Sequence, residues 1–285
     1  MSFQIDTAFS KQYKDTITLL VQQGGSRLRD SVRNEVQIGE KAFWEQIGAT
    51  SAKLKTTRHG DSPLVSTPHS RRQSTMLDYE WGDYIDQNDM NKMIIDPTSM
   101  YMLNARNAMG RAIDDAIITN ALGTAFTGKE GATSVTFPAT QVVTATSGLN
   151  LDALTATLEK FNANNVDPDE EKYLVCGSQQ ITNLLGINQV TSVDFNTNRA
   201  LTTGKVGSFM GFTFIQTERL PKVSTVRSCI AYTKSGLLLA LGKDITTNIA
   251  QRPDKSFSWY IYACMSIGAT RMEEERVVRI DCTEV

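Results

Sequence analysis

Histidine and cysteine are scarce in this sequence, and their placement excludes several kinds of active site. Only two histidines occur among the 285 residues, His59 and His69, and both lie in one polar stretch. A histidine-based metal site or catalytic triad is therefore excluded elsewhere in the chain. The four cysteines are Cys176, Cys229, Cys264 and Cys282. None lies within four residues of another, so no zinc-ribbon or CxxC pattern exists, and we expect reduced, buried thiols.

Long apolar runs and a charge excess are also absent. No stretch approaches the roughly 20 apolar residues of a membrane helix, and the start MSFQIDTAFSKQYKD lacks the apolar core of a signal peptide. Lys and Arg number 29 and Asp and Glu 31, a formal net charge of -2. A dedicated nucleic-acid binder usually has a clear basic excess, so that class is disfavoured. The composition, 40% hydrophobic and 21% charged, is that of an ordinary globular protein.

Motifs for nucleotide binding and catalysis are missing or incomplete. GxSxG, GxGxxG and HExxH do not occur. Gly123, Gly128 and Lys129 read as GxxxxGK, but a phosphate-binding loop needs a strand before it and a helix after it. The pattern here predicts the reverse order, and Glu130 stands where Ser or Thr would hold magnesium. Nucleotide binding is therefore disfavoured.

Two polar clusters are also better explained without chemistry. His59 and Asp61 lie beside Ser62, but their loop offers no rigid frame for a triad. The run 273–275 is Glu-Glu-Glu with arginines on both sides, which favours a salt-bridged edge, exposed or between subunits, over a cation site. We therefore predict no catalytic residue, no cofactor and no metal site.

A basic stretch is followed at once by an acidic one. Residues 53–76 carry five Lys or Arg against Asp61, and residues 77–90 carry five acids and no base. Two solvated faces would explain this. The sharper hypothesis is a long two-stranded loop whose limbs attract each other or those of a neighbouring subunit, because an isolated hairpin is marginal in water. The candidate intersubunit contacts are Lys53, Lys55, Arg58, Arg71, Arg72, Asp78, Glu80, Asp83 and Asp86.

Periodicity predicts a mixture of helices and strands. Residues 96–123 form a long helix, with Asp96 and Pro97 at its start, Gly123 after its end and an apolar stripe between. A second amphipathic helix covers 151–165, and strand-like runs follow to the C-terminus. Residues 1–35 look like an arm that needs a partner surface. The irregular alternation predicts an α+β fold with mixed sheets.

The order of these parts carries a resemblance to a known family. The segments concerned are HGDSPLVSTPHSRRQSTMLDYEWGDYID (59–86), DPTSMYMLNARNAMGRAIDDAIITNALG (96–123), VGSFMGFTFIQTERLP (206–221) and GATRMEEERVVRIDC (268–282). Together they resemble the major capsid protein of tailed bacteriophages, with the Hong Kong 97-type coat fold. The likeness covers nearly the whole chain.

The resemblance implies a domain organisation. Residues 1–50 would be the N-terminal arm and the start of the peripheral domain, 51–92 the extended loop, 93–148 the peripheral domain with the spine helix 96–123, 149–245 the axial domain, and 246–285 the C-terminal strands of the peripheral domain.

The resemblance also implies a function and partners. Copies would form hexamers and pentamers that tile an icosahedral shell around double-stranded DNA, after assembly in the host cytoplasm. A separate scaffolding protein, a portal and a decoration protein are possible partners, and no membrane is expected. The alternatives are another virion component, such as a tail or decoration protein, and, far less favoured, a nucleotide-binding enzyme.

Overall fold

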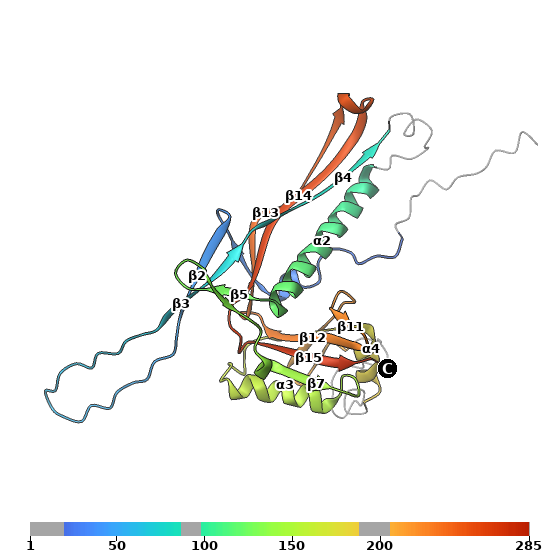
Figure 1. The fold of residues 1–285 in the computed structure, drawn as a ribbon. Coiled ribbons are helices and arrows are strands. Elements are labelled where there is room, and N and C mark those ends of the chain that lie inside the picture. The colour runs from blue at the N-terminus through green and yellow to red at the C-terminus, as the bar shows by residue number, and fades with distance from the viewer. Residues whose placement is uncertain (1–19, 87–97, 188–205, 285) are drawn as a thin grey trace, which may run out of the picture.

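The described residues form three sheets, and one long helix lies along one of them (Figure 1). The structure is a computed structural model that describes residues 20–86, 98–187 and 206–284. Helices and strands alternate along the chain, which confirms the α+β class. The first part of the arm and most of the polar loop expected over 188–207 lie outside the described residues.

The long sheet has four strands in the order β1-β13-β14-β4. β13 and β14 are antiparallel, β4 is antiparallel to β14, and β1 is parallel to β13. Side chains alternate along β14, so that Ile261 and Met265 are buried while Tyr260 and Tyr262 are half-buried on the opposite face. Helix α2 covers the buried face. The bounds are β1 Arg33–Val36, β4 Leu77–Ile85, β13 Leu237–Arg252, β14 Ser258–Arg271 and α2 Thr98–Leu122.

Helix α2 lies where the sequence predicts a long helix. It contains no proline and ends just before Gly123, whose N–H donates to the Thr119 carbonyl oxygen at 2.8 Å. Ala105, Met109 and Ile113 recur every four residues and are buried against the long sheet. Its 25 residues span about 37 Å, long enough to brace most of the sheet.

The described part of the arm is anchored on α2 by a buried aspartate. Asp114 is fully buried, and its carboxylate accepts hydrogen bonds from Ser26 Oγ at 2.6 Å and from the N–H groups of Arg27 and Leu28 at 3.1 Å. A Cβ at Gly110 would lie 2.3 Å from the backbone of Gly25, so only glycine permits this crossing. From about residue 22 onward, the arm is therefore held by its own chain. The expectation that it needs a partner surface is wrong for this part.

The compact domain is a seven-stranded sheet with two helices. Its main order is β7-β15-β12-β8-β10-β9, and β11 pairs with β12. Phe161, Phe212, Leu174 and Ile230 form part of its core. The bounds are η3 Ala139–Gln141, β7 Val142–Ala145, α3 Leu151–Ala163, β8 Lys172–Cys176, α4 Ser178–Leu185, β9 Ser208–Phe209, β10 Phe212–Gln216, β11 Lys222–Val223, β12 Val226–Thr233 and β15 Val277–Thr283.

The sheet topology departs from the expected domain boundaries at several strands. β15 lies between β7 and β12 in the compact domain, although residues 246–285 were all expected in the peripheral strands. Conversely, β13 belongs to the long sheet, although its first part falls in the range 149–245. The reason is burial: Val278 and Ile280 of β15 point into the compact core, which the local strand pattern does not reveal.

The third sheet carries the projecting hairpin and has the order β2-β3-β5-β6. β3 pairs with β2 along its whole length, but with β5 only at Arg72 and Gln73. The bounds are β2 Lys41–Ile47, β3 His69–Thr75, β5 Ala125–Thr127 and β6 Thr133–Val135; two further 3-10 turns lie at η2 Arg29–Ser31 and η4 Pro253–Lys255.

The basic and acidic limbs do not pair with each other. β3 in the basic limb pairs with β2, whereas the acidic limb forms β4 and pairs with β14. The hypothesis of one hairpin built from 53–76 and 77–90 is therefore wrong. Tyr79 and Trp81 alternate with Asp78 and Glu80 along β4 and pack against the core cluster that includes α2. Burying these large side chains outweighs attraction between exposed charges.

The C-terminal end of the compact domain is closed by an ion-pair cluster. The Glu284 side chain is 5% exposed and accepts hydrogen bonds from Lys222 Nζ, from Arg227 Nε at 2.5 Å and from Gln180 Nε2 at 3.1 Å. Burial alone would raise the pKa of Glu284. The three hydrogen bonds outweigh burial and lower this pKa to about 2.

Replacing Asp114 tests the anchoring of the arm. We expect Asp114→Asn to lower the free energy of unfolding by about 2–3 kcal/mol, because the carboxylate accepts several charge-assisted hydrogen bonds in a buried place. Denaturant unfolding of the unassembled chain measures this. The exposed Asp30→Asn is the matched control, and equal effects of the two variants would contradict the role of Asp114.

The Glu284 cluster predicts a pH dependence. Because the folded pKa is depressed, the stabilisation is fully present above the ordinary pKa of 4.5 and is lost as the pH falls toward about 2. Glu284→Gln is expected to lose about 2 kcal/mol at neutral pH. Unfolding curves of the parent and the variant should converge between pH 4.5 and about 2. A pH-independent difference would disprove this linkage.

Candidate assembly surfaces

The loop between β2 and β3, residues 48–68, is exposed along its whole length and projects away from the rest of the chain (Figure 1). The Gly48 N–H donates to the Pro68 carbonyl oxygen at 2.9 Å and closes its base. Lys53 Nζ donates to the Leu64 carbonyl oxygen at 3.1 Å and ties its two limbs together. The loop therefore has the shape of an open hairpin and projects away from the rest of its own chain.

This loop is both basic and apolar. Its bases are Lys53, Lys55 and Arg58, and its only acid is Asp61. Leu54 and Leu64 are 89% and 87% exposed. Exposed leucines are costly in water, and here they lie on a segment that also carries positive charge. Both features are typical of a surface that another molecule covers.

The acidic residues of β4 have no basic partner among the described residues. Asp78 accepts a hydrogen bond from Ser266 Oγ at 2.5 Å, and Glu80 accepts one from Tyr262 Oη at 2.8 Å. Asp83 accepts only from the next backbone N–H, at 2.8 Å. β4 is also the end strand of its sheet, so no described strand pairs with its outer edge. This edge therefore combines negative charge with open backbone groups.

Tyrosines line the face of the long sheet that α2 leaves uncovered. The Tyr84 and Tyr260 rings stack with centroids 4.6 Å apart, and the Tyr260 and Tyr262 rings lie 6.0 Å apart. The Arg252 guanidinium lies 5.9 Å from the centroid of the Tyr260 ring. Asp86, just past β4, is exposed. Such a face accepts cations both by charge and by its aromatic rings.

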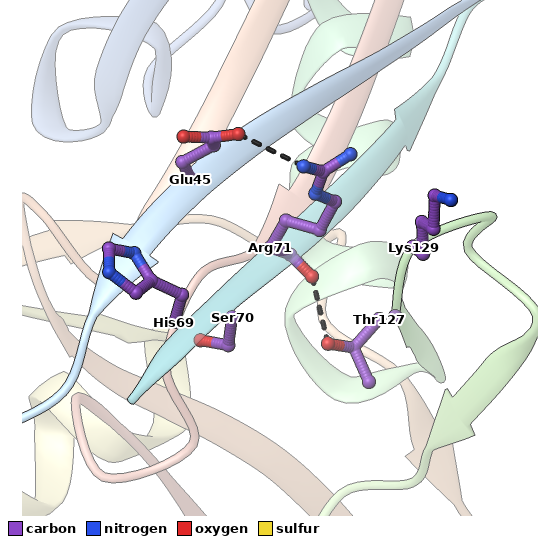
Figure 2. A pocket seen from close by; sticks show the side chains of 7 residues that line it. Glu45, His69, Ser70, Arg71, Thr127 and Lys129 are labelled. Atoms are coloured by element: carbon purple, nitrogen blue, oxygen red, sulfur yellow. Dashed lines mark hydrogen bonds and ion pairs between the residues drawn. The ribbon is translucent and has the colours of Figure 1, made fainter. Parts of the chain in front are cut away.

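The two neighbouring arginines of β3 have different roles. Arg71 is half-buried at the base of the hairpin, and its Nη2 donates to Glu45 at 3.0 Å (Figure 2). Arg72 is buried, donates from Nε to the Met272 carbonyl oxygen at 2.8 Å and pairs with Glu274 at 2.5 Å. The expectation that Arg72 forms an intersubunit contact is therefore wrong, because its charge is used inside the chain.

Arg271 was not recognised in the sequence as a core residue. Its side chain is fully buried and donates to the carbonyl oxygens of Ala121 at 2.9 Å, Gly123 at 2.8 Å and Val135 at 3.2 Å, and it pairs with Glu274. Burial lowers its pKa, against the opposing effect of Glu274. The one signal in the sequence that could have indicated its burial is its position at the end of the alternating strand β14, next to the apolar Met272.

The Glu run at 273–275 forms salt bridges within the chain. Arg276 pairs with both Glu273 and Glu170 at 2.5 Å, and Glu274 binds the two arginines already described. Glu275 is exposed. The expected salt-bridged edge is present, and these pairs join residues of one chain.

The motifs considered for chemistry are far from a catalytic arrangement. Gly123 follows α2, whereas Gly128 and Lys129 form the turn between β5 and β6, so no helix begins there to bind a phosphate. His59 and Asp61 lie on the exposed loop.

The cysteines are free, and Cys264 is half-buried whereas the other three are buried. Within residues 20–86, 98–187 and 206–284, no group of three His, Cys, Asp or Glu side chains is placed to hold a metal ion. In the same part of the chain, no helix has both the length and the apolar character to span a membrane.

Comparisons with known proteins identify the class. The family model described as phage capsid protein matches residues 5–284, so the chain belongs to the phage capsid protein family. No curated protein matches it. Family and fold together make it a major capsid protein, a structural protein of the virion with the Hong Kong 97-type fold of icosahedral shells.

Several solved capsids share this fold at low sequence identity. The capsid structure of the cyanophage P-SCSP1u has a TM-score of 0.76 at 14% identity, over 100% of this chain and 96% of that chain. The capsid of Ralstonia phage GP4 has a TM-score of 0.74 at 9% identity, over 100% and 98%. The capsid of a native GTA particle has a TM-score of 0.71 at 12% identity, over 99% and 97%.

The two arginines of β3 should respond differently to charge reversal. We expect Arg72→Glu to lower the free energy of unfolding by about 3–5 kcal/mol, since it places two carboxylates together in a buried site. Arg71→Glu should cost at most about 1 kcal/mol, as for an exposed pair. Denaturant unfolding of unassembled chains separates the two, and similar losses would show that Arg72 is not the internal partner.

Proposed function

We propose that copies of this chain form the hexamers and pentamers of an icosahedral shell that encloses double-stranded DNA. The observation that carries this proposal is the exposed loop 48–68, because its leucines and bases are left in water and the hydrogen bond from Lys53 Nζ to the Leu64 carbonyl oxygen stays within the loop. A segment of this kind is ordered and desolvated when sibling copies cover it. The chain acts as a building block and performs no catalysis.

Each part of the fold has a role in such a shell. The long sheet with α2 forms the peripheral domain, and the compact domain is the axial part that points toward the capsomer centre. A near-neutral net charge of -2 suits a wall that faces packaged DNA without binding it tightly. The shell assembles in the host cytoplasm, with a scaffolding protein, a portal and a decoration protein as possible partners.

The contacts between copies join the loop to the acidic strand. We place Lys53, Lys55 and Arg58 of one copy against Asp78, Glu80, Asp83 and Asp86 of another. The charges are opposite, and the apolar loop residues and the tyrosine face add burial. Many such contacts, each weak, hold a shell because every subunit makes several at once.

Electron microscopy of the purified chain tests the function, because closed shells, tubes and monomers differ in outline. We expect closed shells from the parent chain. Tubes would favour a tail protein, and persistent monomers under all assembly conditions would refute a self-assembling coat.

Charge reversal of the loop tests the contacts. The variant Lys53→Glu, Lys55→Glu, Arg58→Glu should raise the protein concentration needed for assembly at least about tenfold, the effect of about 1.4 kcal/mol per contact. The circular dichroism of the unassembled chain should not change, since these side chains are exposed. The charge-preserving variant Lys53→Arg, Lys55→Arg, Arg58→Lys is the control. Normal shells from the reversed variant would refute these contacts.

A further inference from the structure

A cleft of about 530 Å³ lies at the base of the projecting hairpin, between β3 and the turn that joins β5 to β6 (Figure 2). None of the contacts proposed above uses it. Its lining residues are Glu45, His69, Ser70, Arg71, Thr127, Gly128 and Lys129. Three strands, β2, β3 and β5, and one turn therefore frame the opening, and most of the side chains that line it carry a polar or charged group.

The charge in this cleft is positive. Arg71 lies on β3 and Lys129 on the turn after β5, and both side chains line the opening (Figure 2). Arg71 uses Nη2 for Glu45, and its guanidinium is steadied 5.6 Å from the centroid of the Phe43 ring. Lys129 has no partner among the described residues. With two cations against the single carboxylate of Glu45, the cleft retains about one positive charge, and the Ser70 hydroxyl adds a donor.

The shape of the cleft suits an extended chain. β5 pairs with β3 only at Arg72 and Gln73, so no strand of the described residues neighbours the edge of β3 at His69–Arg71 on the cleft side. There, Thr127 Oγ1 donates to the Arg71 carbonyl oxygen at 2.8 Å. A strand edge without a neighbouring strand, next to two cations, favours an extended segment with carboxylates.

We propose that this cleft receives the acidic outer edge of β4 from a second copy of the chain, with a carboxylate placed between Arg71 and Lys129. β4 carries Asp78, Glu80 and Asp83 without a basic partner in the described chain, on an unpaired edge. In its own chain β4 runs along β14 away from the cleft, so the occupant comes from another copy (Figure 1). The inference rests on the proposed shell function. It adds the cleft as a second binding site for the acidic strand, in addition to the loop 48–68.

The cleft favours a carboxylate over a phosphate. Glu45 lies within it and would repel a multiply charged group, whereas one carboxylate balances the remaining charge. No helix begins at the cleft to stabilise a phosphate. Binding of inorganic phosphate or of packaged DNA is therefore an alternative that the experiment should exclude.

Reversal of the unpaired lysine tests the proposal. Lys129→Glu should raise the concentration needed for shell formation at least about tenfold, while the unfolding curve of the unassembled chain stays that of the parent. Glu130→Lys, in the same turn but outside the cleft lining, is the matched control and should assemble normally. Lys129→Arg should also assemble normally. If the parent forms shells and Lys129→Glu does so equally well, the cleft proposal fails while the coat function stands. If the parent forms no shells, both fail.

Cross-linking identifies the occupant directly. Shells assembled from a mixture of isotopically labelled and unlabelled chains are treated with a water-soluble carbodiimide, which joins an amine to a carboxylate in contact with it. We expect mixed-label peptides that link Lys129 to Asp78, Glu80 or Asp83. Links from Lys129 to other regions only, or none, would overturn the proposal. The proposal would also be overturned if Lys129→Glu lost only the binding of inorganic phosphate or DNA and still assembled normally.

Discussion

The architecture depends on one buried charge, the guanidinium of Arg271. It binds the carbonyl oxygens at the end of α2 and one on β6, and it shares Glu274 with Arg72 of the hairpin. Helix, long sheet and hairpin meet at this point, and the chain continues from it into β15 of the compact domain. A buried cation is tolerated only when acceptors surround it, so these elements are held in one arrangement.

The groups around Arg271 bind one another within the chain. The exposed features that remain are therefore available to other copies of the chain. The described part of the arm is anchored by Asp114, and the strand end near Glu284 by its ion pairs, so both are fixed internally. The surfaces that the described residues leave open include the loop 48–68, the outer edge of β4 and the cleft beside Lys129. These surfaces are opposite in charge and lie on separate elements. A chain of this kind satisfies its own interior and leaves complementary surfaces for its siblings.

The local elements were largely predictable, but their pairing was not. The four-residue spacing of apolar side chains in α2 and the alternation in β14 are local signals, and both elements lie where the pattern predicts them. The acidic limb was expected to pair with the basic one, but Trp81 lies on the other side of the same strand and packs beneath α2. The charges of the two limbs can be read from the sequence. The apolar surface of α2 against which the acidic limb packs cannot, because it is formed by tertiary contacts.

The sequence by itself determined the α+β class, the long helix and the likeness to phage coat proteins, because these depend on composition, local periodicity and the order of parts. Tertiary structure alone decided that Arg72 and Arg271 are internal, that β15 joins the compact sheet, and that Arg71 and Lys129 share a cleft. Such facts depend on contacts between residues distant in the chain. An arginine looks the same in sequence whether backbone carbonyls or water will surround it.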